Sequence, residues 1–202
     1  MKKYLLLLIS HLILFASPAA AQTAKSVLDK TASTLSSYPS VTANFHAALG
    51  GRGGTTGTIT LQGRKFFVQG AEALVWFDGQ TQWMLLPSTN EVNITTPTPQ
   101  ELQQMNPYYF LNLYKSGYDL TLRTEGPYDI VTMKAQRKAG IKEMEVTIQR
   151  STHLPARVKM TSQRGTVSTI AISNIHRGKR LPDSRFQFRQ KEYPKAQIID
   201  LR

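Results

Sequence analysis

The chain has 202 residues, and its 25 Lys and Arg against 13 Asp and Glu give a net charge of +12. It has no cysteine, which excludes a disulfide framework, a lipidated cysteine behind an export signal and a cysteine nucleophile. The positive charge favours anionic partners, such as lipid headgroups or acidic protein surfaces, and says nothing about the fold.

Residues 1–21 are typical of a cleavable secretory signal peptide. Lys2 and Lys3 precede an apolar run over residues 5–15, and a small-residue stretch ends in Ala19-Ala20-Ala21. We predict cleavage after Ala21 and one exported, soluble domain over residues 22–202. A retained anchor is the less favoured alternative, because a spanning helix needs about 20 apolar residues. Without Lys2 and Lys3 the charges are 23 against 13, or +10, and export makes nucleic acid the least expected partner.

Apolar spacing predicts one amphipathic helix over Thr23–Ser37, with Pro39 as a stop. The period then changes to two, which is typical of strands, and the short spacings indicate antiparallel neighbours. The expected strands are Val41–Leu49, Thr55–Gln62, Lys65–Gln69, Leu74–Phe77, Gln82–Leu86, Glu91–Thr95, Tyr118–Thr124, Tyr128–Gln136, Glu143–Arg150, Arg157–Ser162, Thr166–Ile175 and Arg185–Gln190.

The segment from Val75 to Leu86 is dense in aromatic and large apolar residues around Asp78-Gly79. We expect a tight hairpin, with Asp-Gly supplying the positive backbone dihedrals of a short turn. Both faces of this hairpin are apolar, and they include the two tryptophans of the chain, Trp76 and Trp83. One face can pack into a core, whereas the other needs a helix, a partner or a ligand to cover it.

Helical spacing returns between Thr96 and Gly117. Thr98 and Glu101 form a capping box around Pro99, and Asn106-Pro107 starts a second, strongly aromatic helix that ends at Gly117. This helix is either ordinary core packing or a lid over an apolar cavity. We expect it to cover the second face of the hairpin, with Trp83 rather than Trp76 facing the cavity.

The C-terminal region is basic and has two open interpretations. Its cations alternate with apolar positions around Phe186 and Phe188, which is typical of a solvated strand face, but they would also suit a patch that docks on a partner or on headgroups. These cations are Arg177, Lys179, Arg180, Arg185, Arg189 and Lys191.

Catalytic motifs are absent from the sequence. His46, His153 and His176 have no metal-ligand spacing, and no serine-nucleophile motif is present. Glu143 and Glu145 share one strand face and could act as an acid and base pair, but an exposed face explains them better. We therefore expect no catalytic residue, metal or cofactor, and favour the binding of an apolar ligand, for which burial of roughly 25 cal/mol per Å² suffices.

The order of these elements, with the motif from Val75 to Trp83 followed by Asn90-Glu91-Val92, resembles the LolA family of periplasmic carriers of outer-membrane lipoproteins. The resemblance implies a mainly β fold with helices (α+β), in which a single unclosed, strongly curved antiparallel barrel has its concave apolar face covered by helices. It further implies an inner-membrane lipoprotein-releasing transporter as donor, an outer-membrane acceptor, and a lid-holding arginine, to which Arg64 is nearest. LolB shares the fold but is a lipoprotein, and the absence of cysteine speaks against that assignment.

Three hypotheses follow. In the first, the chain is a monomeric, non-catalytic carrier that binds the acyl chains of a lipoprotein or a related lipid and touches membranes only transiently. The second is a lipid- or peptide-sensing module that acts on a membrane-bound partner through its basic surface, and the third is an enzyme acting on a glycolipid or polyketide-like substrate. The residues expected at the carrier's ligand site are Phe66, Val68, Val75, Phe77, Trp83, Leu85, Tyr108, Phe110 and Leu113.

Overall fold

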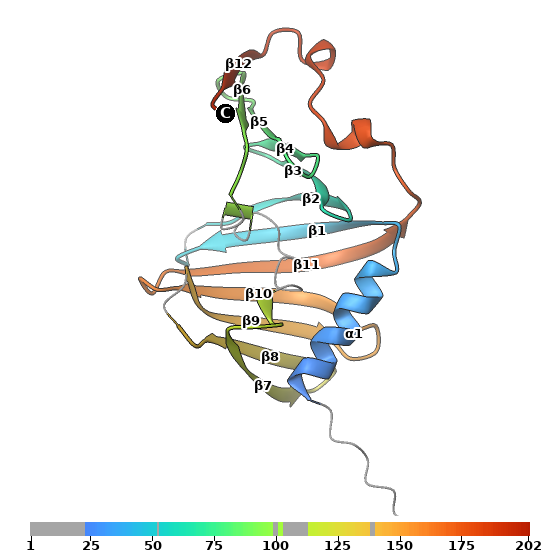
Figure 1. Ribbon diagram of the computed structural model, residues 1–202, viewed down its shortest axis with the longest axis vertical. Helices are drawn as coiled ribbons and strands as arrows, with labels where there is room; N and C mark the ends of the chain where they lie inside the picture. Colours follow the sequence, from blue (N-terminus) through green and yellow to red (C-terminus); the bar gives the residue numbers. More distant parts are fainter. Residues whose placement is uncertain (1–22, 52, 99–100, 103–112, 138–139) are drawn as a thin grey trace, which may run out of the picture.

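The computed structural model describes residues 23–51, 53–98, 101–102, 113–137 and 140–202 (Figure 1). In this part of the chain twelve strands form one open sheet in the order β12-β6-β5-β4-β3-β2-β1-β11-β10-β9-β8-β7. Every neighbouring pair is antiparallel except β12 with β6. The fold is therefore mainly β, and the antiparallel pairing predicted from the short spacings is confirmed for all but the last strand.

The elements have the following bounds: α1 (Ala24–Ser36), β1 (Ser40–Leu49), β2 (Thr55–Gln62), β3 (Lys65–Gly70), β4 (Leu74–Phe77), β5 (Gln82–Leu86), β6 (Glu91–Thr95), β7 (Tyr118–Glu125), β8 (Tyr128–Ala135), β9 (Ile141–Gln149), β10 (Leu154–Ser162), β11 (Val167–Gly178), the 3-10 helices η2 (Asp183–Phe186) and η3 (Gln190–Glu192), and β12 (Gln197–Asp200). Four predicted strands, β2, β4, β5 and β6, match residue for residue.

Helix α1 lies across one side of the sheet, against β7, β8 and β10 (Figure 1). It begins at a capping box in which the Thr23 hydroxyl accepts from the Ser26 amide and the Ser26 hydroxyl accepts from the Thr23 amide. Its buried residues include Val27, Leu28 and Leu35, which recur at helical spacing on the face toward the sheet. The predicted N-terminal helix is thereby confirmed.

The sheet has a face covered by α1, here called the helix face, and an opposite outer face. Each has its own buried cluster. The helix-face core joins α1 to strands from both halves of the sheet and includes Leu28, Phe66, Phe77, Met133 and Val146. The outer core consists of Phe67, Trp76, Leu85, Val92, Ile94, Phe186 and Ala196, with Trp83, Leu181, Phe188 and Tyr193 packed around it.

The outer core is covered by the C-terminal segment, which corrects two predictions. Arg185–Gln190 is not a strand: η2 ends there and the chain continues across the outer face, because the β6 edge is occupied by β12. This segment covers the hairpin face that carries both Trp76 and Trp83, so the prediction that Trp83 faces a cavity under a helical lid is wrong. The Phe186 side chain is fully buried there, and the Phe188 and Tyr193 rings both meet the Trp76 ring at centroid distances of 5.6 Å.

The Asp78-Gly79 hairpin differs from the expected two-residue turn. Its connection spans residues 78–81, and only Gly79 has positive φ, at 107°. Asp78 acts through its side chain instead, since its Oδ1 accepts hydrogen bonds from the Gln80 and Thr81 amides at 3.0 and 2.8 Å. This loop makes Trp76 and Trp83 direct cross-strand partners, so both lie on the outer face.

The inserted segment is described only at its ends. The predicted capping box is confirmed, because the Thr98 amide donates to Glu101 Oε2 at 2.7 Å and the Glu101 amide to Thr98 Oγ1 at 3.3 Å. The aromatic helix predicted between Pro107 and Lys115 lies largely outside the described residues. None of the described helices is long and apolar enough to cross a membrane.

Candidate functional site

The helix face carries an apolar surface built by cross-strand pairing. Ala43, Ile59, Val68 and Val75 are successive partners across β1 to β4, so their side chains lie side by side on one face. Val68 and Val75 are only half-buried, in contrast to Phe66 and Phe77 one row away, of which 1% and 2% is exposed. The apolar row therefore continues from a closed core to an accessible surface.

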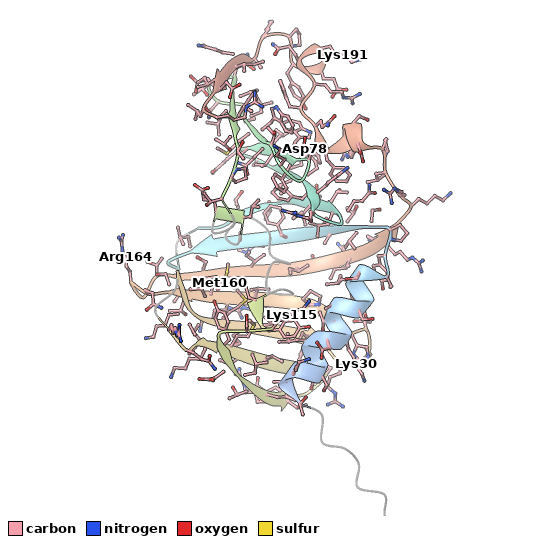
Figure 2. All side chains as sticks on the ribbon, in the orientation of Figure 1. Lys30, Asp78, Lys115, Met160, Arg164 and Lys191 are labelled. Carbon is pink, nitrogen blue, oxygen red and sulfur yellow. The ribbon has the colours of Figure 1, made fainter. Side chains whose placement is uncertain are left out.

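The same surface extends across β1, β11 and β10. Phe45 pairs with Ile172, Ala47 with Ile170 and Ser168 with Met160. Phe45, Ile170 and Met160 are half-buried and pack against the helix-face core; Figure 2 labels Met160 on β10. Met160, Met144 and Met133 are successive partners across β10, β9 and β8, and methionine side chains adapt readily to irregular apolar shapes.

Gly57 has no side chain between the backbone of the apolar surface and the Phe45 ring. A Cβ at Gly57 would lie 2.8 Å from Phe45 Cζ and 2.3 Å from the Gln69 carbonyl oxygen. Gly70 is its partner on β3. The pair leaves no side chain at this point of the helix face, and the Phe45 ring lies over the glycine instead.

One buried polar group belongs to this face. Gln82 pairs with Phe77 on β4 and with Thr95 on β6, and only 3% of it is exposed. Its Oε1 has no hydrogen-bond partner among the described residues. A buried acceptor without a partner costs about 1 to 3 kcal/mol, so an N–H or O–H group brought to it would gain a hydrogen bond.

The end of the inserted segment is tied to α1. Tyr114, which is buried, donates from its hydroxyl to Asp29 Oδ1 at 2.6 Å, and Lys25 pairs with Asp29 Oδ2 at 2.7 Å. Burial, reinforced by the hydrogen bond to Asp29, raises the pKa of Tyr114 to about 12. The hydrogen bonds from Lys25 and then Tyr114 lower the pKa of Asp29. The phenol and the carboxylate are therefore held in their hydrogen-bonding forms at neutral pH.

The structure brings together part of the predicted ligand site. Phe66, Val68, Val75, Phe77 and Leu113 all lie in or against the helix-face core. Trp83 and Leu85 belong to the outer core, which corrects the prediction that they share a face with Val75 and Phe77. The pairing of Leu74 with Leu85 and of Trp76 with Trp83 turns all four outward.

The other predicted residues are located as follows. Tyr108 and Phe110 lie outside the described residues. Arg64 is exposed in the turn between β2 and β3, and lines a pocket of about 530 Å³ beside Ser36 and Tyr38 at the end of α1. Its predicted role of holding a lid stays a prediction.

Several residues of the apolar surface were missed in the sequence. All three lie in predicted strands, Phe45 and Met160 between polar neighbours and Ile170 between Thr169 and Ala171. This alternation of large apolar with polar or small residues is the signal that could have found them. The pattern indicates that each has a buried side. It does not indicate that the three meet Val68 and Val75 on one face, since β1 pairs with β11 across more than a hundred positions of sequence.

The carboxylates considered as an acid and base pair lie on the outer face. Glu143 pairs with Lys134 and Glu145 with Lys159 across neighbouring strands, and Arg123 reaches Glu145 at 3.0 Å. Both carboxylates thus lie opposite lysines on neighbouring strands, and Glu145 also forms an ion pair with Arg123. In the described part of the chain, no group of three or more His, Asp or Glu side chains is arranged to hold a metal ion.

Comparison with known proteins identifies the family. The model of the family described as "Outer membrane lipoprotein carrier protein LolA" matches residues 13–164. The chain belongs to this LolA family. The match ends before β11, so the C-terminal cover of the outer core lies beyond it. No curated protein sequence matches.

A solved structure shares the fold. An uncharacterised conserved protein from Thermus thermophilus is 16% identical with a TM-score of 0.60, covering 89% of this chain and 99% of its own. Two further structures match less closely. A LolA superfamily protein from Nitrosomonas europaea is 14% identical with a TM-score of 0.43, covering 83% and 99%. The MucA/MucB complex of Pseudomonas aeruginosa matches at 15% identity and a TM-score of 0.46, covering 83% of this chain and 62% of the other.

Proposed function

We propose that this LolA-family chain is a periplasmic, non-catalytic carrier that binds the acyl chains of lipoproteins, or of a related lipid, on the helix face of its sheet. The observation that carries the proposal is the half-buried apolar surface of Phe45, Val68, Val75, Met160 and Ile170 beside a closed core. Each buried methylene contributes about 0.8 kcal/mol, so a long acyl chain binds firmly without specific polar contacts.

In this proposal the sheet curves around the acyl chain as a half-barrel and the inserted segment acts as its lid. The hydrogen bond from Tyr114 to Asp29 supports such a role, because it fixes the C-terminal end of the insert on α1. Arg64 would hold the lid, and the signal peptide ending at Ala21 would direct the chain to the periplasm as a single domain.

The binding step is tested with the mature protein. We expect mass spectrometry of an organic extract to detect co-purified lipid, and a fluorescent fatty acid to bind saturably. Replacing Val75 with Asp should weaken the affinity for the fatty acid at least about tenfold, since a charge would be buried against the acyl chain. The matched control is Thr58→Asp, an exposed position on the opposite face of β2.

Circular dichroism and thermal melts check that the variants fold. If Val75→Asp does not fold, Val75→Thr provides a milder polar change. Equal binding by the Val75 variants and Thr58→Asp would contradict the proposed site. A protein that binds no lipid in either assay would contradict the function itself.

Gln82 supplies a polar test of the same site. If its Oε1 accepts a hydrogen bond from the amide or hydroxyl of an acylated ligand, Gln82→Leu should weaken the affinity for an N-acyl amino acid about fivefold or more. The free energy of unfolding should be unchanged or increased. A fatty acid methyl ester, which has no donor, should bind both proteins alike. Equal loss for both ligands would indicate a change of packing only.

Directional transport is a separate step. We infer that an inner-membrane lipoprotein-releasing transporter loads the carrier and that an outer-membrane acceptor unloads it, because differences in affinity alone can drive transfer. Loaded protein should release lipoprotein to acceptor-containing vesicles and retain it with plain vesicles. A deletion strain with normal lipoprotein transfer would favour the alternative of a lipid- or peptide-sensing module acting on a membrane-bound partner.

A further inference from the structure

A second candidate site lies at one end of the sheet, where the α1 terminus, the β2–β3 turn, the β4–β5 loop and the chain after β11 meet. The pocket there has a volume of about 530 Å³. Its cations are Arg64, Lys65 and Arg180, and its polar groups include Ser36, Tyr38 and Gln62. Residues more than a hundred positions apart thus contribute positive charge to one hollow.

Arg180 is held in the pocket by its neighbours on both sides. The preceding carbonyl, of Lys179, accepts from the Ser40 hydroxyl at 2.7 Å. The following residue, Leu181, is bound twice by the Gln62 amide group, with Leu181 N to Gln62 Oε1 at 2.7 Å and Gln62 Nε2 to Leu181 O at 3.0 Å. Gln62 is buried. The structure therefore fixes the backbone that brings Arg180 next to the turn of Arg64.

Countercharge within the pocket is incomplete. Lys65 pairs with Asp183 at 2.6 Å, and Asp78 has one carboxylate oxygen taken by two backbone amides of its own loop. In the described part of the chain, Arg64 and Arg180 form no ion pair, although Asp183, whose pKa is lowered chiefly by Lys65, is also affected by the charge of Arg180. The carboxylates of Asp78 and Asp183 and the C-terminal end of α1, which contributes about half a negative charge, together offset only part of the charges of Arg64, Lys65 and Arg180.

Arg177 adds to the field, since its guanidinium lies 5.6 Å from the centroid of the Tyr38 ring. Placing several cations together costs free energy that a bound anion recovers. Guanidinium groups match the oxygens of phosphate in a bidentate fashion, and the volume is within the range of small-ligand pockets.

We propose that this pocket binds a phosphate group through Arg64 and Arg180, either as the headgroup of an anionic lipid or as a soluble phosphate ester. The site is separate from the apolar surface of the helix face. Arg64 is shared with the proposed lid, whereas Arg180 has no part in the proposed carrier function, so Arg180→Gln tests the phosphate site independently of it.

The test uses the mature protein with two probes: glycerol phosphate in calorimetry, and flotation with vesicles of phosphatidylglycerol or of phosphatidylcholine alone. Arg64→Gln and Arg180→Gln remove one pocket charge each. Lys30→Gln and Lys191→Gln remove one exposed charge outside the pocket, on α1 and in η3; Figure 2 labels both lysines well apart from Asp78 of the pocket.

We expect glycerol phosphate to bind at one site. Each arginine variant should weaken its affinity about tenfold, whereas the affinity of each lysine variant should stay within about twofold of wild type. A lipid headgroup is identified by three results together. The protein binds phosphatidylglycerol vesicles, the arginine variants lose this binding, and glycerol phosphate competes with the vesicles for the protein. A protein that binds glycerol phosphate but does not bind phosphatidylglycerol vesicles would have a soluble phosphate ester as its ligand. The proposal is overturned if neither probe binds, or if all four variants lose equally, which would reflect net charge only.

Discussion

The hydrogen bond from Tyr114 to Asp29 makes one residue pair responsible for anchoring the inserted segment. Replacing Tyr114 with Phe should lower the free energy of unfolding by about 1 to 2 kcal/mol, because a hydrogen bond to a charged acceptor is lost. Urea unfolding measures the loss, and hydrogen exchange at residues 113–117 should rise with it. An unchanged exchange rate there would show that the bond does not hold the insert.

The same pair sets a pH dependence. The pKa of Tyr114 is raised from 10.0 to about 12, so its stabilising effect is complete below pH 10 and is lost as the pH rises through about 12. The pKa of Asp29 is lowered from 3.8, so its effect is present above 3.8 and is lost as the pH falls through the lowered value. The stability gap between wild type and Tyr114→Phe should therefore shrink in acid. A gap that is constant from neutral to acid pH would contradict this.

Gly57 is required by close approach of the backbone rather than by positive φ. Because a Cβ would lie 2.3 Å from the Gln69 carbonyl oxygen, Gly57→Ala should lower the free energy of unfolding by about 1 to 3 kcal/mol. Gly53→Ala is the matched control, since no heavy atom lies within 4 Å of its Cβ position, and should change stability by less than about 0.5 kcal/mol. Similar losses in chemical denaturation would disprove this explanation.

At the scale of elements, the C-terminal segment covers the hairpin face that carries Trp76 and Trp83. Phe186 has no exposed surface and packs in the outer core. Phe186→Ala should cost about 3 to 5 kcal/mol, and Phe188→Ala, which is half-buried, clearly less. Guanidinium denaturation followed by tryptophan fluorescence measures both, because the Phe188 ring is 5.6 Å from that of Trp76. A cost for Phe186→Ala below that of Phe188→Ala would contradict the assignment.

For the whole molecule, the two cores share strands and should unfold together. Phe66 and Phe67 are neighbours in β3, yet one belongs to the helix-face core and the other to the outer core. We expect residues 22–202 to unfold in one calorimetric transition whose van't Hoff and calorimetric enthalpies agree, and Phe186→Ala to move that transition as a unit. Two transitions, only one of them shifted by Phe186→Ala, would indicate separate domains.

Local patterns predicted most elements because their causes are local. Leu74–Phe77 and Gln82–Leu86 are bounded by turn residues and rich in strand formers, and the structure ends them at the same residues. Thr98 and Glu101 form the expected capping box. Gln197–Asp200 escaped notice because this strand depends on a partner, β6, that lies more than a hundred positions away in the sequence.

The sequence by itself determined that this is a mainly β, cysteine-free, strongly basic chain with an amphipathic N-terminal helix and an apolar hairpin, since composition and period depend on neighbouring residues alone. Only the tertiary structure decided that Trp76 and Trp83 face the C-terminal segment, that Val68 and Val75 share the helix face with Phe45, and that Arg64 and Arg180 line one pocket. Those placements depend on register and on distant strand partners, and a shift of one residue in register exchanges the two faces of a sheet.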